Sequence, residues 1–402
     1  MSQHQPDSRY SWFRLAVSLT LATLGGVGLW APVIALPIVQ SEFGVDRAGA
    51  SIPYTLTMIG FGLGGLFMGR MADRFGIVFP MFIGTILLAL GFVGAALAPT
   101  YWTFIAAQAG LIGLFGVATT FGPLVADVSL WFQKRRGVAV GIVASGNYLA
   151  GAIWSPLLSR SIDSFGWRTS FIYIGVAILV IMLPLTLLLR PRASLAERPS
   201  AMASASTARG TPALQGLLVL AGLACCVAMS MPQVHIIAYC GDLGYGRAAG
   251  AQMLSLMLGC GVLSRLLSGY FSDRIGGVGT LIIGSVLQCL ALVFYIPFDG
   301  LASLYLVSAL FGLAQGGIVP SYALIVRDNF PAAEAGFRIS LVLTATVLGM
   351  ALGGWLSGEI FDKTGSYTWA FAHGILWNLL NMSIAVWLLL RNRKAAGKPI
   401  LT

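Results

Sequence analysis

A single cation, Arg265, lies in an apolar stretch from Ala251 to Phe271 that carries no other charge. An ionised side chain is costly inside a lipid bilayer and usually marks a transport pathway. The guanidinium group is always charged, and its planar fork of donors fits a carboxylate. No acidic residue lies at a similar depth in the other apolar stretches. The sequence therefore predicts that Arg265 binds a small organic anion. The alternative is that its side chain snorkels to the interface or pairs with a backbone carbonyl.

Two residues near the end of an earlier apolar stretch could take up a proton when such an anion loads. Asp242 lies at the end of this stretch, and His235 lies two turns before it. Histidine titrates in the physiological range. The alternatives are a loop cap before Gly244 for Asp242 and a hydrogen-bonded packing residue for His235. The sequence does not decide between these interpretations.

Four further polar residues interrupt apolar stretches and could line a central cavity. They are Thr119, Asn147, Tyr148 and Tyr322. Each could donate a hydrogen bond to an anion, so we list them as candidate substrate contacts. Ordinary hydrogen bonding between membrane helices is the alternative for each of them.

The elements that must position these residues are membrane helices. The chain is 57% hydrophobic and only 9% charged, whereas a soluble protein has about 25% charged residues. Each apolar stretch is near or above the ~20 residues that cross a bilayer. An all-α membrane protein of twelve transmembrane helices is predicted, with spans at 13–39, 50–70, 78–98, 101–127, 137–158, 168–190, 213–240, 249–271, 279–297, 301–326, 337–360 and 369–390.

The basic residues report the orientation of these spans. Most Lys and Arg residues fall in connections on the same side as both termini, and the exceptions are Arg47, Arg160, Arg168, Arg247 and Lys363. By the positive-inside rule both termini are then cytoplasmic. The net charge of +10 thus reflects topology, and no nucleic-acid partner is expected. No cleavable targeting segment stands out, which favours a bacterial inner membrane.

The two halves of the chain repeat. Residues 69–76 (GRMADRFG) recur as 269–276 (GYFSDRIG), and 163–166 (DSFG) recur as 362–365 (DKTG). Two matches at nearly one offset indicate a parallel duplication of six-helix halves. We expect an N-terminal bundle over 1–190, a flexible linker rich in Ser, Ala and Pro over 191–212, and a C-terminal bundle over 213–402. We expect a monomer.

The repeated loop resembles the signature of the major facilitator superfamily, G-x-x-A-D-R-x-G, although Ile77 and Val78 replace its usual basic pair. This resemblance covers nearly the whole chain and implies transport by rocking of the two halves. The loop residues are interpreted as a conformational latch, in which an acid pairs with an arginine in one state only. These residues are Gly69, Asp73, Arg74, Gly76, Asp273 and Arg274.

A narrower set of motifs is similar to monocarboxylate transporters and oxalate/formate antiporters. The motifs are WFQKRRGVAVGI at 131–142, followed by Ser145, Gly146 and Pro156, PQVH at 232–235, and Arg265 followed by Gly269. The resemblance implies that Arg265 binds the substrate carboxylate. Two departures matter: no central lysine occurs in 337–360, where the antiporters carry one, and Gly261 replaces an acid of the animal transporters.

The expected function is proton-coupled symport of a small monocarboxylate such as lactate or pyruvate, by alternating access. The alternatives are an organic-anion exchanger of the oxalate/formate type and a metabolite or drug effluxer. We find no nucleotide-binding loop, catalytic triad or metal-ligand spacing, so no enzyme activity, cofactor or metal is expected.

Overall fold

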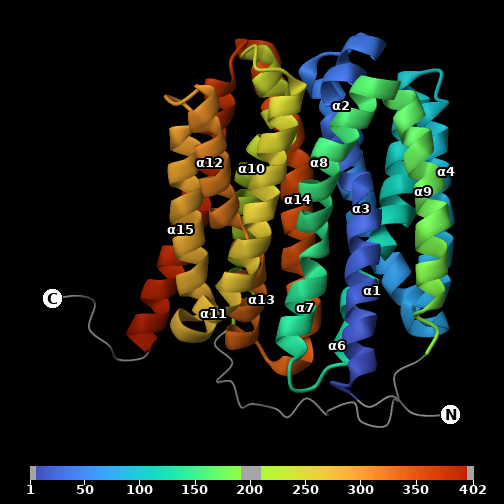
Figure 1. Cartoon of the computed structure of the whole chain (residues 1–402). Coiled ribbons are helices and arrows are strands. Elements are labelled where there is room, and N and C mark those ends of the chain that lie inside the picture. Colours follow the sequence, from blue (N-terminus) through green and yellow to red (C-terminus); the bar gives the residue numbers. More distant parts are fainter. Residues whose placement is uncertain (1–5, 192–209, 396–402) are drawn as a thin grey trace. The chain divides into compact units, whose positions relative to one another are not determined.

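The computed structural model describes residues 6–191 and 210–395, and within these ranges the chain is helical without any strand (Figure 1). The predicted linker over 191–212 therefore lies largely outside the described residues. Contacts between residues divide the chain into two compact units. Unit 1 comprises residues 1–198 and 235–259, and unit 2 comprises residues 199–234 and 260–402.

Unit 1 is built from the helices of the first half and a helical hairpin from the second. Its helices are α1 (Arg9–Gly25), α2 (Val27–Phe43), α3 (Arg47–Phe75), α4 (Val78–Ala96), α5 (Tyr101–Ala106), η1 (Ala107–Val117), α6 (Gly122–Leu130), α7 (Arg136–Ala144), α8 (Gly146–Phe165) and α9 (Trp167–Leu187). The hairpin over 235–259 joins the end of α10 (Pro212–Asp242) to the start of α11 (Arg247–Phe294). We call the end of unit 1 at which α1 begins the near end, and the opposite end, which holds this hairpin turn, the far end.

Unit 2 contains the remaining parts of α10 and α11 and four later helices. These are α12 (Leu301–Gln315), α13 (Ile318–Asn329), α14 (Ala332–Thr364) and α15 (Tyr367–Ala395). The 48-residue α11 consists of two helices that meet at Gly276, whose φ of 75° and ψ of 168° are not helical. Gly76 ends α3 with φ 84° and ψ 164°. This positive φ favours glycine, and the two repeated segments therefore end in the same turn.

Polar residues cap the starts of several helices. Asp46 precedes α3, and its side chain accepts a hydrogen bond from the backbone N–H of Gly49 at 2.6 Å. Thr100 and Thr103 form a capping box at the start of α5. Such caps satisfy backbone N–H groups that have no partner within the helix.

Glycine allows close helix packing in unit 1, where α3 packs along η1. A Cβ atom added at Gly64 would lie 1.8 Å from the carbonyl oxygen of Leu114, whereas one added at the neighbouring Gly65 would meet nothing within 4 Å. Membrane helices associate through such small-residue contacts. Gly64 therefore lies on the face of α3 that packs against η1, and Gly65 does not.

A buried ion pair fastens the near end of unit 1. Nε and Nη2 of Arg14 in α1 each lie 2.8 Å from one carboxylate oxygen of Asp127 in α6. Nη1 of Arg14 also donates to the carbonyl oxygens of Leu189 and Pro191, just after α9. The guanidinium lies over the Trp131 ring, 4.6 Å from its centroid. One side chain thus joins the first helix, the fourth span and the end of the sixth.

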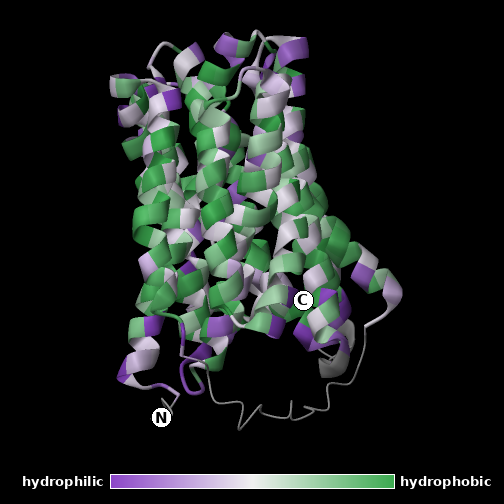
Figure 2. Cartoon of the chain, turned by 90° about the vertical axis from the view of Figure 1, so that its right-hand side faces the viewer, coloured by the Kyte–Doolittle hydropathy of each residue, from purple (hydrophilic) through white to green (hydrophobic). Residues whose placement is uncertain are grey.

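Within the described residues, eleven helical segments are long and apolar enough to cross a membrane. Figure 2 shows apolar residues along the middle of the helices and polar residues gathered at their ends. Many large apolar side chains, such as Leu306 and Val180, are exposed on the surface. This distribution suits lipid as the surrounding solvent, and the chain is an integral membrane protein.

Candidate substrate-binding site

A small pocket in unit 1 lies where three of its spans are broken. The break between α1 and α2 falls at Gly26, that between η1 and α6 at residues 118–121, and that between α7 and α8 at Ser145. Irregular backbone at membrane depth is tolerated where it is buried or lines a cavity. The pocket has room for about one water molecule. It is lined by Ala22, Gly26, Leu29, Phe61, Val117, Thr120, Phe121 and Asn147.

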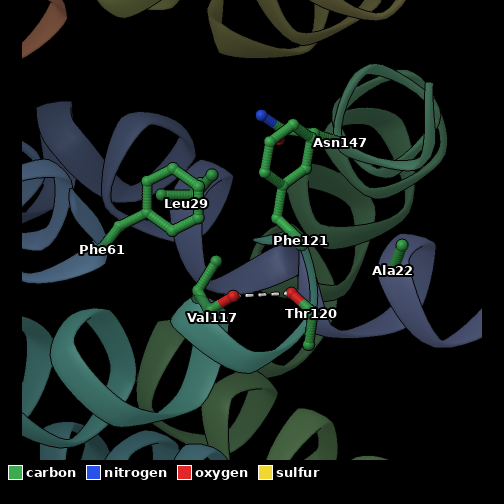
Figure 3. Close-up of a pocket in the computed structure, with 8 residues that line it drawn as sticks. Ala22, Leu29, Phe61, Val117, Thr120, Phe121 and Asn147 are labelled. Carbon is green, nitrogen blue, oxygen red and sulfur yellow. Dashed lines mark hydrogen bonds between the residues drawn. The ribbon is translucent and has the colours of Figure 1, made fainter. Parts of the chain in front are cut away.

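Two aromatic rings and one side-chain amide line this pocket (Figure 3). The rings of Phe61 and Phe121 contact edge to face, with centroids 5.9 Å apart. The side chain of Asn147 lies beside Phe121, and within the described part of the chain its buried Oδ1 accepts no hydrogen bond. The Thr120 hydroxyl donates to the carbonyl oxygen of Val117 at 2.8 Å. The pocket thus has apolar and aromatic walls and offers one acceptor, Oδ1 of Asn147, without a hydrogen-bond donor among the described residues.

The backbone around Asn147 is held in place by indole groups. Nε1 of Trp30 in α2 donates to the carbonyl oxygen of Asn147 at 3.0 Å. Nε1 of Trp154 in α8 donates to the carbonyl oxygen of Thr23 at 3.0 Å. Both carbonyls lie within a few residues of the breaks at Gly26 and Ser145, and the two bonds link α8 to α1 and α2.

Arg265 lies in α11 within unit 2 and is partly buried. Eighteen residues separate it from the start of α11 and eleven separate it from Gly276, so it lies at about 27 Å and 16 Å along the helix from these points. Its Nε lies 3.5 Å from the carbonyl oxygen of Gly316. This contact is long for a hydrogen bond, and the role of Arg265 in anion binding stays a prediction.

A helix break also lies beside Arg265, at Gly316 between α12 and α13. A Cβ atom at Gly316 would lie 2.5 Å from the backbone nitrogen of Arg265 and 2.6 Å from the carbonyl oxygen of Gly261. Ser264 donates to the carbonyl oxygen of Leu313 at 2.6 Å. Only glycine allows this approach, which seats the α11 turn that carries Arg265 against the break.

The other predicted substrate contacts have different surroundings. Asn147 lines the unit 1 pocket, and Thr120 does so in place of its neighbour Thr119. Thr119 is fully buried, and it donates to the carbonyl oxygen of Gly116. Tyr148 is buried in α8 and is not among the residues that line the pocket.

Tyr322 belongs to a buried polar network inside unit 2. Its hydroxyl donates to Oδ1 of Asn381 at 2.7 Å, and Nδ2 of Asn381 lies 2.8 Å from the Ser285 hydroxyl. Nδ2 of Asn378 donates to the carbonyl oxygen of Ser285. The network joins α11, α13 and α15 and is consistent with interhelical bonding, while the role of Tyr322 as a substrate contact stays a prediction.

The two proton-coupling candidates both lie in the hairpin of unit 1. His235 is fully buried in α10. Asp242 is paired with Arg47 at the start of α3, where Nη1 and Nη2 each lie 3.1 Å from one carboxylate oxygen. Their roles in proton transfer stay predictions, and Asp242 has a charged partner that the sequence did not indicate.

The charged residues of the predicted latch lie in the last turn of α3, before Gly76, and in the corresponding turn of α11, before Gly276. Asp73, Arg74, Asp273 and Arg274 are all exposed, and within the described residues no ion pair involves them. The guanidinium of Arg274 lies 4.2 Å from the centroid of the Tyr270 ring. The latch itself stays a prediction.

Several residues of interest escaped the sequence reasoning. Phe61, Phe121 and Leu29 line the pocket, but apolar residues in apolar helices give no signal of their own. Arg47 and Arg247 stand out in the sequence as basic residues on the sparsely charged side. Because basic residues are rare on that side, their presence was the signal in the sequence that they could form specific contacts.

Broken spans around a pocket, a cation in the middle of an apolar helix and a repeated glycine-ended loop define a class, the helical membrane transport proteins. The model of the Major Facilitator Superfamily matches residues 18–301 and 251–401, and the chain belongs to this superfamily.

Two relatives and one crystal structure are also similar to the chain. The chain is 27% identical over 307 residues to monocarboxylate transporter 13 of Bos taurus, with 75% of this chain and 71% of that protein covered. It is 29% identical over 321 residues to the fujikurins efflux protein of Gibberella fujikuroi, with 75% and 67% covered. A crystal structure of a POT family transporter in complex with 5-aminolevulinic acid superposes with a TM-score of 0.75 at 12% identity, over 94% of this chain and 96% of that one.

Proposed function

We propose that the chain is a secondary transporter of small organic anions, and that its cargo is a monocarboxylate carried together with a proton by alternating access. The observation that carries this proposal is Arg265, a partly buried guanidinium in α11 beside the helix break at Gly316. A carboxylate bound there gains charge-assisted hydrogen bonds and relieves the cost of the cation in a membrane span.

Coupling to a proton follows from electrostatics. An anion that enters an inside-negative cell works against about 2.3 kcal/mol per 100 mV for each charge. A proton carried along removes this cost. His235 and Asp242 remain the candidates for its acceptor, and protonation of Asp242 would also weaken its ion pair with Arg47.

The proposed topology has twelve spans in two six-helix halves, because α11 divides at Gly276 into two of them. The charge asymmetry of the connections favours cytoplasmic termini and a bacterial inner membrane. The near end is then cytoplasmic and the far end faces outside. Interpreted in this way, the repeated loops with Gly76 and Gly276 lie at the cytoplasmic surface, where the latch would act.

The test is uptake of labelled lactate and pyruvate into proteoliposomes with an imposed inward proton gradient. Loss of charge-assisted contacts worth about 1.5–3 kcal/mol predicts that Arg265→Ala raises KM by about 10- to 150-fold. Arg265→Lys keeps the charge but lacks the planar fork of donors, so its KM should lie between those of the native protein and Arg265→Ala.

Arg338→Ala is the matched control, because Arg338 forms an i,i+4 pair with Glu334 in α14 and has no proposed contact with cargo. Uptake unchanged in Arg265→Ala would sink the assignment of the anion site. Absence of uptake by the native protein would exclude these two cargoes. Uptake that requires an internal anion rather than a proton gradient would favour exchange of the oxalate/formate type.

A second candidate is export of larger organic acids that contain an aromatic group. Phe61 and Phe121 line the pocket, and aromatic side chains bind flat apolar groups well. Because the pocket has room for about one water molecule, the two rings would have to separate to admit such a group. The relative from Gibberella fujikuroi is named as an efflux protein. Under this function, benzoate and phenylpyruvate would compete with lactate, and Phe121→Ala would weaken their competition without changing that of pyruvate. Equal competition in both proteins would exclude it.

A further inference from the structure

A groove lies in the surface of unit 1 between α8 and α9. It has a volume of about 250 Å³, and its walls come from residues 154–161 of α8 and 170–177 of α9. The two helices are joined at the far end by a tight turn at Gly166, whose φ is 77°. Beyond this turn α9 packs mainly along α4 rather than α8. The groove is the space that this packing leaves between α8 and α9, and we call it the α8–α9 groove.

The polar groups that line the groove already have partners. The hydroxyls of Ser161 and Ser170 lie 2.8 Å apart, and Ser170 donates to the carbonyl oxygen of Gly166 at 2.8 Å. Nε1 of Trp154 donates to the carbonyl oxygen of Thr23 at 3.0 Å. The other lining side chains are those of Leu, Ile, Ala and one Tyr. An occupant of the groove is therefore bound by apolar contact.

The position of the groove along its helices corresponds to one leaflet of a bilayer. Its residues lie between three and eleven residues from the far ends of α8 and α9, which is about 5–17 Å at 1.5 Å per residue. Each leaflet contributes about 15 Å of hydrocarbon beneath a headgroup layer of about 5–7 Å. The groove thus lies at the depth of the acyl chains of the far-end leaflet.

The size and exposure of the groove suit an acyl chain. A water molecule takes about 30 Å³ in the liquid, and a methylene group is similar in size, so the groove has room for about eight carbons of a chain. Leu157 and Tyr173, one on each wall, are 49% and 53% exposed. The Tyr173 ring contacts that of Phe165 at the end of α8, with centroids 5.6 Å apart. Tyrosine at the outer end of a span is typical of the membrane interface.

An unpaired cation, Arg160, lies at the outer end of the α8–α9 groove. It is exposed, and within the described residues it forms no ion pair. Five basic residues were predicted on the side opposite the termini, and the other four each pair with an acid: Arg47, Arg168, Arg247 and Lys363. Arg160 follows Leu157 by three residues, and residues at this spacing are neighbours on a helix surface. The guanidinium can therefore reach the outer part of the groove.

The depth of Arg160 matches that of a lipid phosphate. It lies five residues before the end of α8, about 7 Å along the helix, at the boundary between headgroups and hydrocarbon. A guanidinium binds a phosphate group through paired, charge-assisted hydrogen bonds. The groove and the cation thus fit the two parts of one amphipathic molecule.

We propose that the α8–α9 groove is a binding site for a phospholipid of the far-end leaflet, with one acyl chain in the groove and the phosphate on Arg160. A second copy of the chain is the less favoured occupant, because twofold pairing through this face would bring two unpaired Arg160 side chains together. The proposal concerns unit 1 alone and is independent of the cargo. The bound lipid would fill the space between α8 and α9 and so hold these helices together.

Photolabelling of the purified chain in detergent tests the proposal. The probe is phosphatidylglycerol with a photoreactive diazirine on one acyl chain, and the labelled residues are located by mass spectrometry after irradiation. We expect the label to concentrate in residues 154–161 and 170–177. Arg160→Gln should require about fivefold more probe for the same labelling of these segments, because one basic residue near the headgroups contributes about this factor in the binding of anionic lipid.

A second variant tests the groove itself. Ala177→Trp fills the groove, so it should abolish the label in both segments. Val180→Trp is the matched control, because Val180 lies three residues further along α9, is 67% exposed and does not line the groove. Lys363→Gln is the control for charge, because Lys363 is an exposed cation that pairs with Glu359. Neither control should change the labelling.

Label spread evenly over exposed apolar positions, including Leu306 in α12, would overturn the proposal, because lipid would then act only as solvent. Unchanged labelling of the groove in Arg160→Gln or in Ala177→Trp would also overturn it. A dimer of the native chain in native mass spectrometry that is lost in Ala177→Trp would instead assign the groove to a second copy. Since no cargo is present, failure of the lactate and pyruvate assay leaves this test intact.

Discussion

The buried pair of Arg14 and Asp127 allows a stability prediction with a definite size. Arg14 is 1% exposed and Asp127 is 12% exposed. Removing one partner of a buried pair leaves an uncompensated charge and costs about 3–5 kcal/mol. At about 2–4 °C per kcal/mol for a unit of this size, Asp127→Ala should lower the thermal midpoint by about 6–20 °C. An exposed i,i+4 pair is worth about 0.3–0.5 kcal/mol, so Glu334→Ala should lower it by about 1–2 °C.

The assay is thermal unfolding in detergent, followed by the fraction of protein that remains monodisperse on size exclusion. Three variants are compared with the native chain: Asp127→Ala, Glu334→Ala, and the double variant with leucine at both Arg14 and Asp127. The double variant should be more stable than Asp127→Ala, because it removes the buried charge together with its partner. It should not recover fully, because the bonds from Arg14 to the carbonyls of Leu189 and Pro191 are lost.

The reasoning is refuted if Asp127→Ala costs no more than Glu334→Ala. That result would mean that water reaches the guanidinium and compensates it. A double variant less stable than Asp127→Ala would also refute it, because the carbonyl contacts of Arg14 rather than the ion pair would then dominate.

Two further predictions concern packing and pH. Gly64→Ala should prevent purification of a monodisperse protein or lower its thermal midpoint by at least 10 °C, because the added methyl group would meet the Leu114 carbonyl. Gly65→Ala is the control and should have no such effect. Equal behaviour of the two variants would contradict the packing of α3 against η1. Asp7 accepts a hydrogen bond from the backbone N–H of Lys134, which lowers the pKa of the Asp7 carboxyl below its ordinary 3.8. The folded state therefore favours the ionised form, so Asp7→Asn should reduce the thermal midpoint at neutral pH, and the difference from the native protein should disappear as the pH falls below 3.8; a difference independent of pH would contradict this.

Sequence periodicity and composition predicted the helical spans well because apolar length is a direct physical requirement of the bilayer. The repeat in the sequence also corresponds to a repeat in the backbone, since Gly76 and Gly276 have similar positive φ angles. Arg265 stood out because a charge within an apolar run has few explanations. In each case the relevant information lies within a few residues of the chain.

Contacts between distant residues could not be predicted in this way. Asp242 and Arg47 are 195 residues apart, and no local pattern links them. Likewise, the Tyr322 hydroxyl donates to Asn381, which lies 59 residues further along the chain in another helix. The pocket depends on where the helices break, which no local pattern in the sequence indicates. An aromatic residue such as Phe121 also looks the same in the sequence whether it faces a pocket or lipid.

The π-helix η1 (Ala107–Val117) has a consequence for the rotational setting of the residues that follow it. Each π turn contains more residues than an α turn, so η1 determines the direction in which Thr120 and Phe121 face. Removing one residue from η1 would rotate everything after it by about 100° relative to everything before it. A single deletion, which adds no new side chain, would therefore turn Phe121 away from the pocket while preserving the composition of the span. The orientation of this aromatic group is encoded by the number of residues that precede it as well as by its own identity.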